Sequence, residues 1–144
     1  KKITVKISDS PLEQELVYDE ARMTQVLVNL LDNAIKYSPY GGTIQIRLIN
    51  EQKLADGTPV AGFCVRDNGP GIAPNDLERI FEVFTQGRGP TAGGTGLGLA
   101  ISRQIVHDHG GSITASNHPD GGATFTIMLP APAFASEPPQ ATLA

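Results

Sequence analysis

A glycine-rich run, 93–98, constrains this chain more than any other segment, because it leads directly into an apolar-periodic stretch, 97–109. Glycine disfavours helix interiors, so the run predicts a loop that opens onto the first turn of a helix. That turn leaves backbone N–H groups unpaired and directs the positive end of the helix dipole outward, which favours an anion. The run lacks the Gly-Lys-Ser/Thr ending of a Walker loop, and no strand leads directly into it as in dinucleotide-binding folds. It therefore indicates another kind of anion site or, alternatively, a flexible hinge.

The periodicity of the remaining sequence predicts strands and helices in one chain. Strands are expected over 2–7, 15–18, 43–49, 60–66, 112–116 and 123–129. Helices are expected over 19–36, with Asp19 as N-cap, and over 75–84. Most strands alternate polar and apolar residues and are joined as hairpins, which leaves one sheet face exposed. We therefore expect an α+β two-layer sandwich, with a mixed, mostly antiparallel sheet covered by helices on one face.

Composition narrows the class of protein. With 144 residues, 40% of them hydrophobic, the chain has the size and apolar content of one ordinary domain. A net charge of −4 argues against a nucleic-acid binder, and the single cysteine, Cys64, excludes a disulfide framework or a cysteine zinc site. No apolar run approaches the roughly 18 residues of a membrane span. We expect a cytoplasmic domain over 1–130, followed by a disordered Ala/Pro-rich tail or linker over 131–144.

One face of the expected helix 19–36 is polar. At about 100° per residue, Asn29, Asn33 and Lys36 fall within about 60° of one another. The opposite side is an apolar core stripe of Leu27, Leu30, Leu31 and Ala34. Asparagine disfavours helix interiors, but its amide oxygen binds Mg²⁺ without adding negative charge near phosphates. The face is therefore either a metal and phosphate site or a solvated surface.

A second polar motif follows the expected strand 60–66. Asp67 ends this apolar strand, and Gly69 and Gly71 then allow the backbone to turn tightly. A buried carboxylate accepts hydrogen bonds only, so it suits the exocyclic amine of adenine and repels the carbonyl oxygen of guanine. The alternative is an ordinary Asx-turn.

The sequence contains four motifs, which follow one another along the chain as 29–37, 67–72, 80–84 and 94–99. Their order and spacing resemble the ATP-binding catalytic domain of sensor histidine kinases. The wider superfamily includes DNA gyrase, the ninety-kilodalton heat-shock chaperone and the MutL mismatch-repair proteins. The resemblance runs from about Lys2 to Pro130 and implies a Bergerat-type fold.

The resemblance implies that the chain binds ATP and Mg²⁺ and transfers the γ-phosphoryl group to a histidine. It implies that Asn33 ligates Mg²⁺, that Asn29 sits beside the metal and the γ-phosphate, and that Asp67 holds the adenine amine. Thr124 resembles the threonine that supports this aspartate through water. Arg88, the only cation in the lid 85–93, is expected to swing onto the phosphates.

The resemblance implies two sets of site residues. The catalytic set is Asn29, Asn33, Lys36 and Arg88. The nucleotide-binding set is Asn29, Asn33, Lys36, Tyr37, Asp67, Gly69, Gly71, Ile72, Phe84, Gly94, Thr95, Gly96, Leu97, Gly98, Leu99 and Thr124.

The residue at position 29 distinguishes the branches of the superfamily. Gyrase-like ATPases place a glutamate there as general base for water, whereas Asn29 cannot take up a proton. A neutral imidazole already carries a lone pair and needs no base, so Asn29 fits transfer to histidine. The alternatives are an ATP-binding regulatory module without transfer, a hydrolytic ATPase of the superfamily, or a serine kinase.

The acceptor histidine is expected outside this chain. None of His107, His109 and His118 lies in an acceptor-type motif. Because the sequence begins at Lys1 rather than Met, we expect it to belong to a longer protein. The resemblance implies that this protein carries the acceptor histidine on a dimerising helical hairpin. The expected partners are that hairpin and a cognate response regulator, with no nucleic acid. The isolated domain is expected to be monomeric and the full-length kinase a homodimer, and a membrane-anchored sensor of which this is the cytoplasmic part is one form that it can take.

Overall fold

The computed structural model describes residues 2–7, 16–82 and 98–131. Five strands, two α-helices and two single 3₁₀ turns make up this part of the chain. In chain order they are β1 (Thr4–Ile7), α1 (Glu20–Tyr37), β2 (Thr43–Lys53), β3 (Pro59–Arg66), η1 (Pro74–Asp76), η2 (Arg79–Phe81), α2 (Gly98–Asp108), β4 (Ser112–Asn117) and β5 (Ala123–Pro130). No helix in these ranges is both long and apolar enough to cross a membrane.

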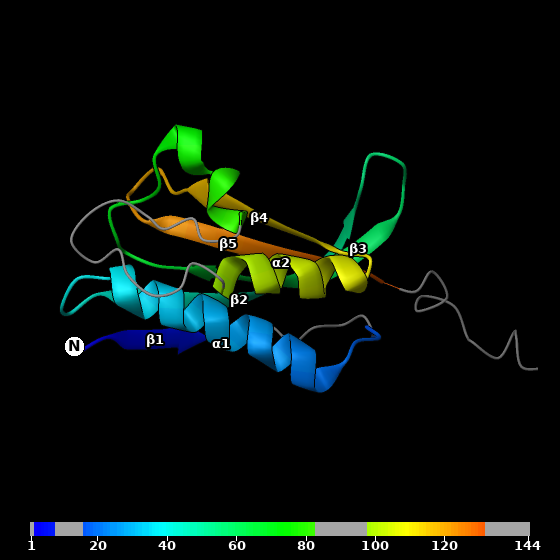
Figure 1. Ribbon diagram of the computed structural model, residues 1–144, viewed down its shortest axis with the longest axis horizontal. Coiled ribbons are helices and arrows are strands. Elements are labelled where there is room, and N and C mark those ends of the chain that lie inside the picture. Colours follow the sequence, from blue (N-terminus) through cyan, green and yellow to red (C-terminus); the bar gives the residue numbers. More distant parts are fainter. Residues whose placement is uncertain (1, 8–15, 83–97, 132–144) are drawn as a thin grey trace, which may run out of the picture.

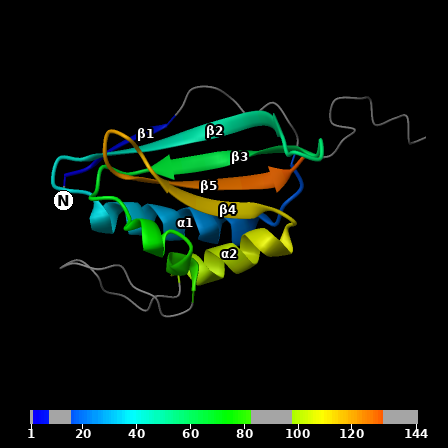
Figure 2. The same cartoon turned by 90° about the horizontal axis from the view of Figure 1, so that it is seen from above.

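The described strands form one sheet in the order β1-β2-β3-β5-β4. β1 is parallel to β2, and every other neighbouring pair is antiparallel. Both α-helices lie on one side of this sheet, and the other side carries none of the described helices (Figure 1, Figure 2). The predicted α+β two-layer sandwich, with a mixed and mostly antiparallel sheet, is confirmed.

The core lies between the helices and the covered face of the sheet. α1 buries residues at three- and four-residue spacing, which is the period of one helix face: Met23, Val26, Leu30 and Ala34. α2 contributes Ile105 and Val106, and β5 contributes alternate residues from Phe125 to Leu129. The predicted stripe is therefore shifted toward Met23 and Val26, because Leu27 and Leu31 are only partly buried.

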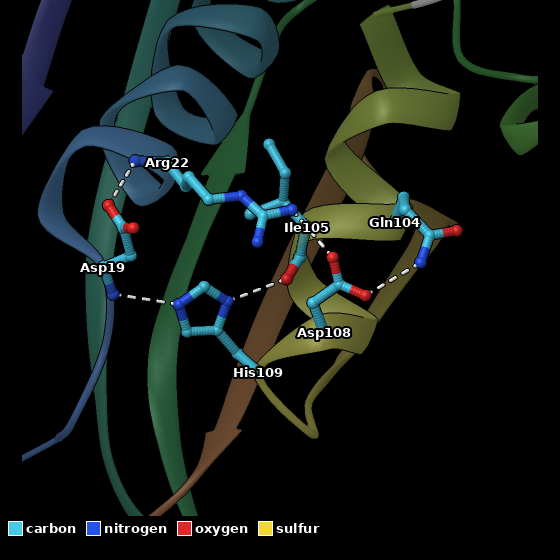
Figure 3. A network of polar contacts seen from close by, with 6 residues as sticks. All are labelled: Asp19, Arg22, Gln104, Ile105, Asp108 and His109. Atoms are coloured by element: carbon cyan, nitrogen blue, oxygen red, sulfur yellow. Dashed lines mark hydrogen bonds and ion pairs between the residues drawn. The ribbon is translucent and has the colours of Figure 1, made fainter.

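A polar network joins the first turn of α1 to the end of α2 (Figure 3). Asp19 caps α1 as predicted, with its Oδ1 accepting from the backbone N–H of Arg22 at 3.1 Å. The guanidinium of Arg22 donates to Asp108 Oδ2 at 2.7 Å, and the amide of Gln104 donates to Oδ1 of the same carboxylate at 2.9 Å. These two hydrogen bonds hold the pKa of Asp108 below its ordinary value.

His109 closes the same network. The backbone N–H of Asp19 donates to its Nε2 at 2.9 Å, so Nε2 must be an unprotonated acceptor. In the neutral ring Nδ1 then carries the hydrogen, and it lies 2.8 Å from the carbonyl oxygen of Ile105. His109 thus ties the start of α1 to α2 as a structural residue.

Two predicted elements differ from the structure. Leu16 to Tyr18, the described part of the expected strand 15–18, are not strand: Leu16 packs on the core, whereas Val17 is 82% exposed. The expected helix 75–84 is replaced, as far as residue 82, by η1 and η2. So short a helix has little stability of its own, and packing on the core decides the conformation. η2 buries Ile80 and Phe81, and the ring of Phe81 meets that of Phe125 edge-on.

Candidate functional site

The polar face of α1 lies beside the beginning of α2. The side-chain amide nitrogen of Asn29 donates to the carbonyl oxygen of Gly98 and to the hydroxyl of Ser102, each at 3.2 Å. Gly98 is the first residue of α2, and a Cβ placed there would lie 3.8 Å from the Asn29 Cγ. Because these contacts use the nitrogen of the amide, they leave Oδ1 as its acceptor atom. Asn29 thus couples the first predicted motif to the helix start that follows the glycine run.

The other α1 candidates continue toward the end of this helix. Asn33, Lys36 and Tyr37 are all half-buried, and Nζ of Lys36 lies 5.6 Å from the centre of the Tyr37 ring. In the described part of the chain, no three His, Cys, Asp or Glu side chains gather as a metal-binding group. The side chain of Asn33 carries an amide oxygen, which is a neutral atom that can ligate a divalent cation.

Asp67 is 4% exposed at the end of β3. Its Oδ1 accepts from the backbone N–H of Gly69 at 2.8 Å and from that of Ala123 at 3.2 Å. Burial raises the pKa of this carboxyl, although both hydrogen bonds and the charge of Arg66 act in the opposite direction. The turn is therefore an Asx-turn, and Oδ2 is the oxygen that can accept from a ligand.

Gly69 brings the Asp67 turn against the end of α1. A Cβ at position 69 would stand 2.6 Å from the carbonyl oxygen of Tyr37, so only glycine allows the two segments to approach this closely. The turn is also fastened to the sheet, because Asn68 Oδ1 accepts from the backbone N–H of Thr43 at 2.6 Å. The structure thus brings the first two predicted motifs together.

Thr124 does not take the expected place beside Asp67. It pairs with Arg66 in the sheet and lines the face opposite the helices. Its neighbour Ala123 faces the core. The N–H of Ala123 donates to Asp67 Oδ1, and the Ala123 carbonyl oxygen accepts from the Asp67 N–H at 3.0 Å. Successive residues of a strand face opposite sides, so a displacement of one residue moves the side chain to the other face.

Sequence reasoning missed two residues of this site. Gly122 has a φ of +87°, and a Cβ there would lie 1.9 Å from the carbonyl oxygen of Asp67. The side chain of Asn117 bonds both backbone polar atoms of Ile72: Oδ1 accepts from its N–H and Nδ2 donates to its carbonyl oxygen, each at 2.7 Å. The Gly121-Gly122 pair was a visible turn signal, but nothing local in the sequence indicates its contact with Asp67.

The remaining candidates divide into two groups. Gly71 and Ile72 lie in the turn that Asn117 holds, and Leu99 is partly buried against the core at the start of α2. The others fall outside the described residues: Phe84, Arg88, Gly94, Thr95, Gly96 and Leu97. Their roles stay predictions, as does the loop 85–96. Of the expected tail 131–144, Ala131 is buried and its N–H donates to the Pro59 carbonyl oxygen, and residues 132–144 lie outside the described part.

Comparison with known proteins decides the family. The family model described as Histidine kinase-, DNA gyrase B-, and HSP90-like ATPase matches residues 18–133. The chain belongs to this family. Its ATP-binding character agrees with a buried acceptor at Asp67 and with the α1 amides beside the start of α2.

Named relatives narrow the branch to histidine kinases. The adaptive-response sensory kinase SasA of Trichormus variabilis is 42% identical over 125 residues, which cover 85% of this chain and 30% of SasA. The mycobacterial sensor histidine kinase MprB has a TM-score of 0.71 at 30% identity, over 90% of this chain and 81% of that chain. Full-length ShkA, in complex with AMPPNP, gives 0.67 at 34% identity, over 90% and 25%. The chain is a histidine kinase-type catalytic ATP-binding domain that spans less than a third of the length of SasA.

Proposed function

We propose that this domain binds Mg-ATP and transfers its γ-phosphoryl group to a histidine on a separate dimerising, phosphoacceptor domain of the same protein. The observation that carries the proposal is the amide of Asn29, which stands at the junction of α1 and α2 where a hydrolytic relative would need a carboxylate. An amide positions and neutralises without taking up a proton.

Adenine recognition is assigned to the Asp67 turn. Two backbone N–H groups occupy Oδ1 of Asp67, which leaves Oδ2 to accept the exocyclic amine of adenine. Gly69, Gly71 and Ile72 form the wall beside it, and Asn117 holds Ile72 in place. This arrangement favours adenine over guanine, because a carboxylate repels the guanine carbonyl oxygen.

The phosphates are assigned to the space between α1 and the start of α2. Asn33 would hold Mg²⁺ through its amide oxygen, with Asn29 alongside and Lys36 and Tyr37 contacting phosphate and ribose. Magnesium, when bound, neutralises the phosphate charge. Helix α2 begins at Gly98, so its unpaired N–H groups and dipole supply further positive potential. Arg88 is proposed to approach the phosphates from the lid.

The transfer requires correct positioning of the reacting groups rather than acid–base catalysis. The lone pair of a neutral imidazole nitrogen forms the N–P bond, while the bond from the γ-phosphorus to the bridging oxygen breaks and ADP leaves. The proton on the other imidazole nitrogen passes to solvent. The phosphohistidine is then the donor for an aspartate of a cognate response regulator, and we assign the reaction to the cytoplasm.

A transfer assay tests the function directly. The full-length kinase that contains this domain is incubated with γ-labelled ATP and Mg²⁺, and the label is followed in protein and in solution. Label on a histidine outside residues 1–144, stable to base and labile to acid, is the expected result. Binding of ATP without labelled protein would instead indicate a regulatory module, and free phosphate alone would indicate a hydrolytic ATPase.

Two isosteric substitutions test the roles proposed for Asn29 and Asn33. Asn33→Asp and Asn29→Asp each place a negative charge beside the phosphates, so transfer should fall at least tenfold, a loss of about 1.4 kcal/mol in transition-state stabilisation. Asn75→Asp, on the exposed turn η1, is the matched control and should leave transfer unchanged. Full activity in Asn33→Asp would contradict the metal assignment.

A further inference from the structure

The helices lie on one side of the sheet (Figure 2). Residues whose side chains belong to the opposite face line a hollow of about 290 Å³. Strands β2, β3, β4 and β5 all contribute lining residues, and the β4–β5 turn forms one side. Its lining residues are Gln45, Arg47, Cys64, Arg66, Ser116, Asn117, His118, Pro119 and Thr124. The proposed nucleotide site lies on the helix side, so this hollow is a separate feature of the domain.

Strand register brings two arginines together here. Arg47 of β2 pairs with Cys64 of β3, and Arg66 of β3 pairs with Gln45 of β2. The two arginines are therefore diagonal neighbours on adjacent strands and on one face, within reach of a common ligand. Lys6 of β1 pairs with Gln45 and adds a third cation to the same row.

The hollow offers more donors than the protein satisfies. Nε of Arg66 is buried and has no hydrogen-bond partner among residues 2–7, 16–82 and 98–131. Its Nη2 reaches the carbonyl oxygen of Gly121 only at 3.5 Å, which is long for a hydrogen bond. A buried N–H of a charged group that lacks an acceptor costs free energy, so this guanidinium is arranged for an acceptor from outside the described protein.

The local charge is opposite to that of the whole chain, which is −4. Its basic lining residues are Arg47, Arg66 and His118, and none of the described lining residues is acidic. Oδ2 of Asp120 lies 3.9 Å from Nδ1 of His118. Asp67, which follows Arg66, has its Oδ1 occupied by two backbone N–H groups. The two arginines therefore face the hollow without an acid between them.

We propose that this hollow binds a small organic anion that carries two or more carboxylate or phosphate groups, held by Arg47 and Arg66. Planar guanidinium groups bind such oxyanions through paired hydrogen bonds. The amide of Gln45 and the hydroxyls of Ser116 and Thr124 supply further donors from the same floor. The volume is near the lower end for ligand pockets and suits a molecule of di- or tricarboxylate size.

NMR spectroscopy of the 144-residue chain tests the site, with citrate and inorganic phosphate as separate probes at constant ionic strength. The Nε–Hε signal of Arg66 and the amide signals of Cys64 and Thr124 should shift and saturate with citrate, and saturate at higher concentration with phosphate. At constant ionic strength the screening of charges does not change, so shifts that grow linearly with both anions would show non-specific association only and overturn the proposal. Saturating shifts confined to α1 and 67–72 would place the anion in the nucleotide site and equally contradict it.

Substitutions locate the anion. Arg47→Gln and Arg66→Gln should each weaken citrate binding about tenfold, read from the Thr124 amide, whereas Arg47→Lys, which keeps the charge but loses the paired hydrogen bonds, should fall between the wild type and Arg47→Gln. Arg103→Gln, which removes a cation from α2 in the other layer, is the matched control and should bind as wild type does. Unchanged far-UV circular dichroism confirms folding of each variant. Equal citrate affinity in the wild type and both glutamine variants would refute the site.

The only cysteine of the chain gives an independent measurement. Cys64 is buried in the floor of the hollow. Citrate should therefore slow the reaction of its thiol with the neutral reagent 4,4′-dithiodipyridine, and should do so less in Arg47→Gln. An unchanged rate at citrate concentrations that saturate the NMR shifts would place the anion elsewhere and overturn the proposal.

Discussion

Asn117 holds Ile72 by both of its backbone polar atoms, across 45 positions of sequence, with two hydrogen bonds of 2.7 Å. The contact joins the end of β4 to the turn that follows Asp67. It fixes the wall of the proposed adenine pocket to the sheet, although Asn117 lies outside the four motifs of the sequence, 29–37, 67–72, 80–84 and 94–99. A single side chain thus substitutes for the strand pairing that this turn cannot make.

Asn117→Ala should weaken ATP binding about fivefold, which corresponds to about 1 kcal/mol and is the size of a net hydrogen-bond contribution. Calorimetric titration with ATP measures this change. Because Asn117 positions the wall and does not touch the reacting atoms, the transfer rate at saturating ATP should stay at the wild-type level. Asn75→Ala is the control for the loss of an exposed asparagine, and a fall in the saturated rate of Asn117→Ala would contradict a purely positioning role.

Asp67→Asn should change the purine preference. The asparagine can keep Oδ1 on the N–H groups of Gly69 and Ala123, but it presents an N–H₂ donor where the carboxylate presented Oδ2. The affinity for ATP should fall at least tenfold, about 1.4 kcal/mol, whereas the affinity for GTP should fall much less or rise. Binding measured with both nucleotides gives the ratio. An unchanged ratio would remove Asp67 from the adenine contact.

The raised pKa of Asp67 predicts the pH dependence of stability. The unfolded chain titrates near the ordinary value of 3.8, whereas the folded carboxyl keeps its proton to higher pH because it is buried. Between these two values the native state binds more protons, so its stability falls as pH rises. The contribution is fully present below the unfolded pKa and is lost as pH passes the folded pKa.

Urea unfolding of the wild type and Asp67→Asn, from below the ordinary aspartate pKa to neutrality, isolates this contribution. The free energy of unfolding of the wild type should decrease relative to the variant across that range and then level off. The opposite slope would show that the hydrogen bonds from Gly69 and Ala123 outweigh the burial of the charge.

Gly122→Ala should disrupt the packing against the backbone of Asp67. The added Cβ would lie 1.9 Å from the Asp67 carbonyl oxygen, and φ is +87°, so the free energy of unfolding should fall by about 3 kcal/mol. Gly121→Ala is a matched control, because φ is +104° there but no atom lies within 4 Å. It should cost about 1 kcal/mol, from the backbone conformation alone. Equal losses in thermal or urea unfolding would refute a specific clash with Asp67.

Much of the fold follows from local pattern. Helical periodicity predicted α1 with its Asp19 cap, and alternation predicted β1 to β5, because these signals depend on near neighbours in sequence. Short apolar stretches were ambiguous. Leu16 and the segment around Ile80 pack on the core, and no local window of sequence contains those contacts.

The sequence alone determined which chemistry is available: the α1 amides, the carboxylate at Asp67 and the glycine run before α2. Only the tertiary structure decided which residues meet. It placed Ala123 rather than Thr124 beside Asp67, brought Asn117 to Ile72, and set Arg47 diagonal to Arg66. The physical reason is that strand register is a non-local property, and one step of register exchanges the two faces of a sheet.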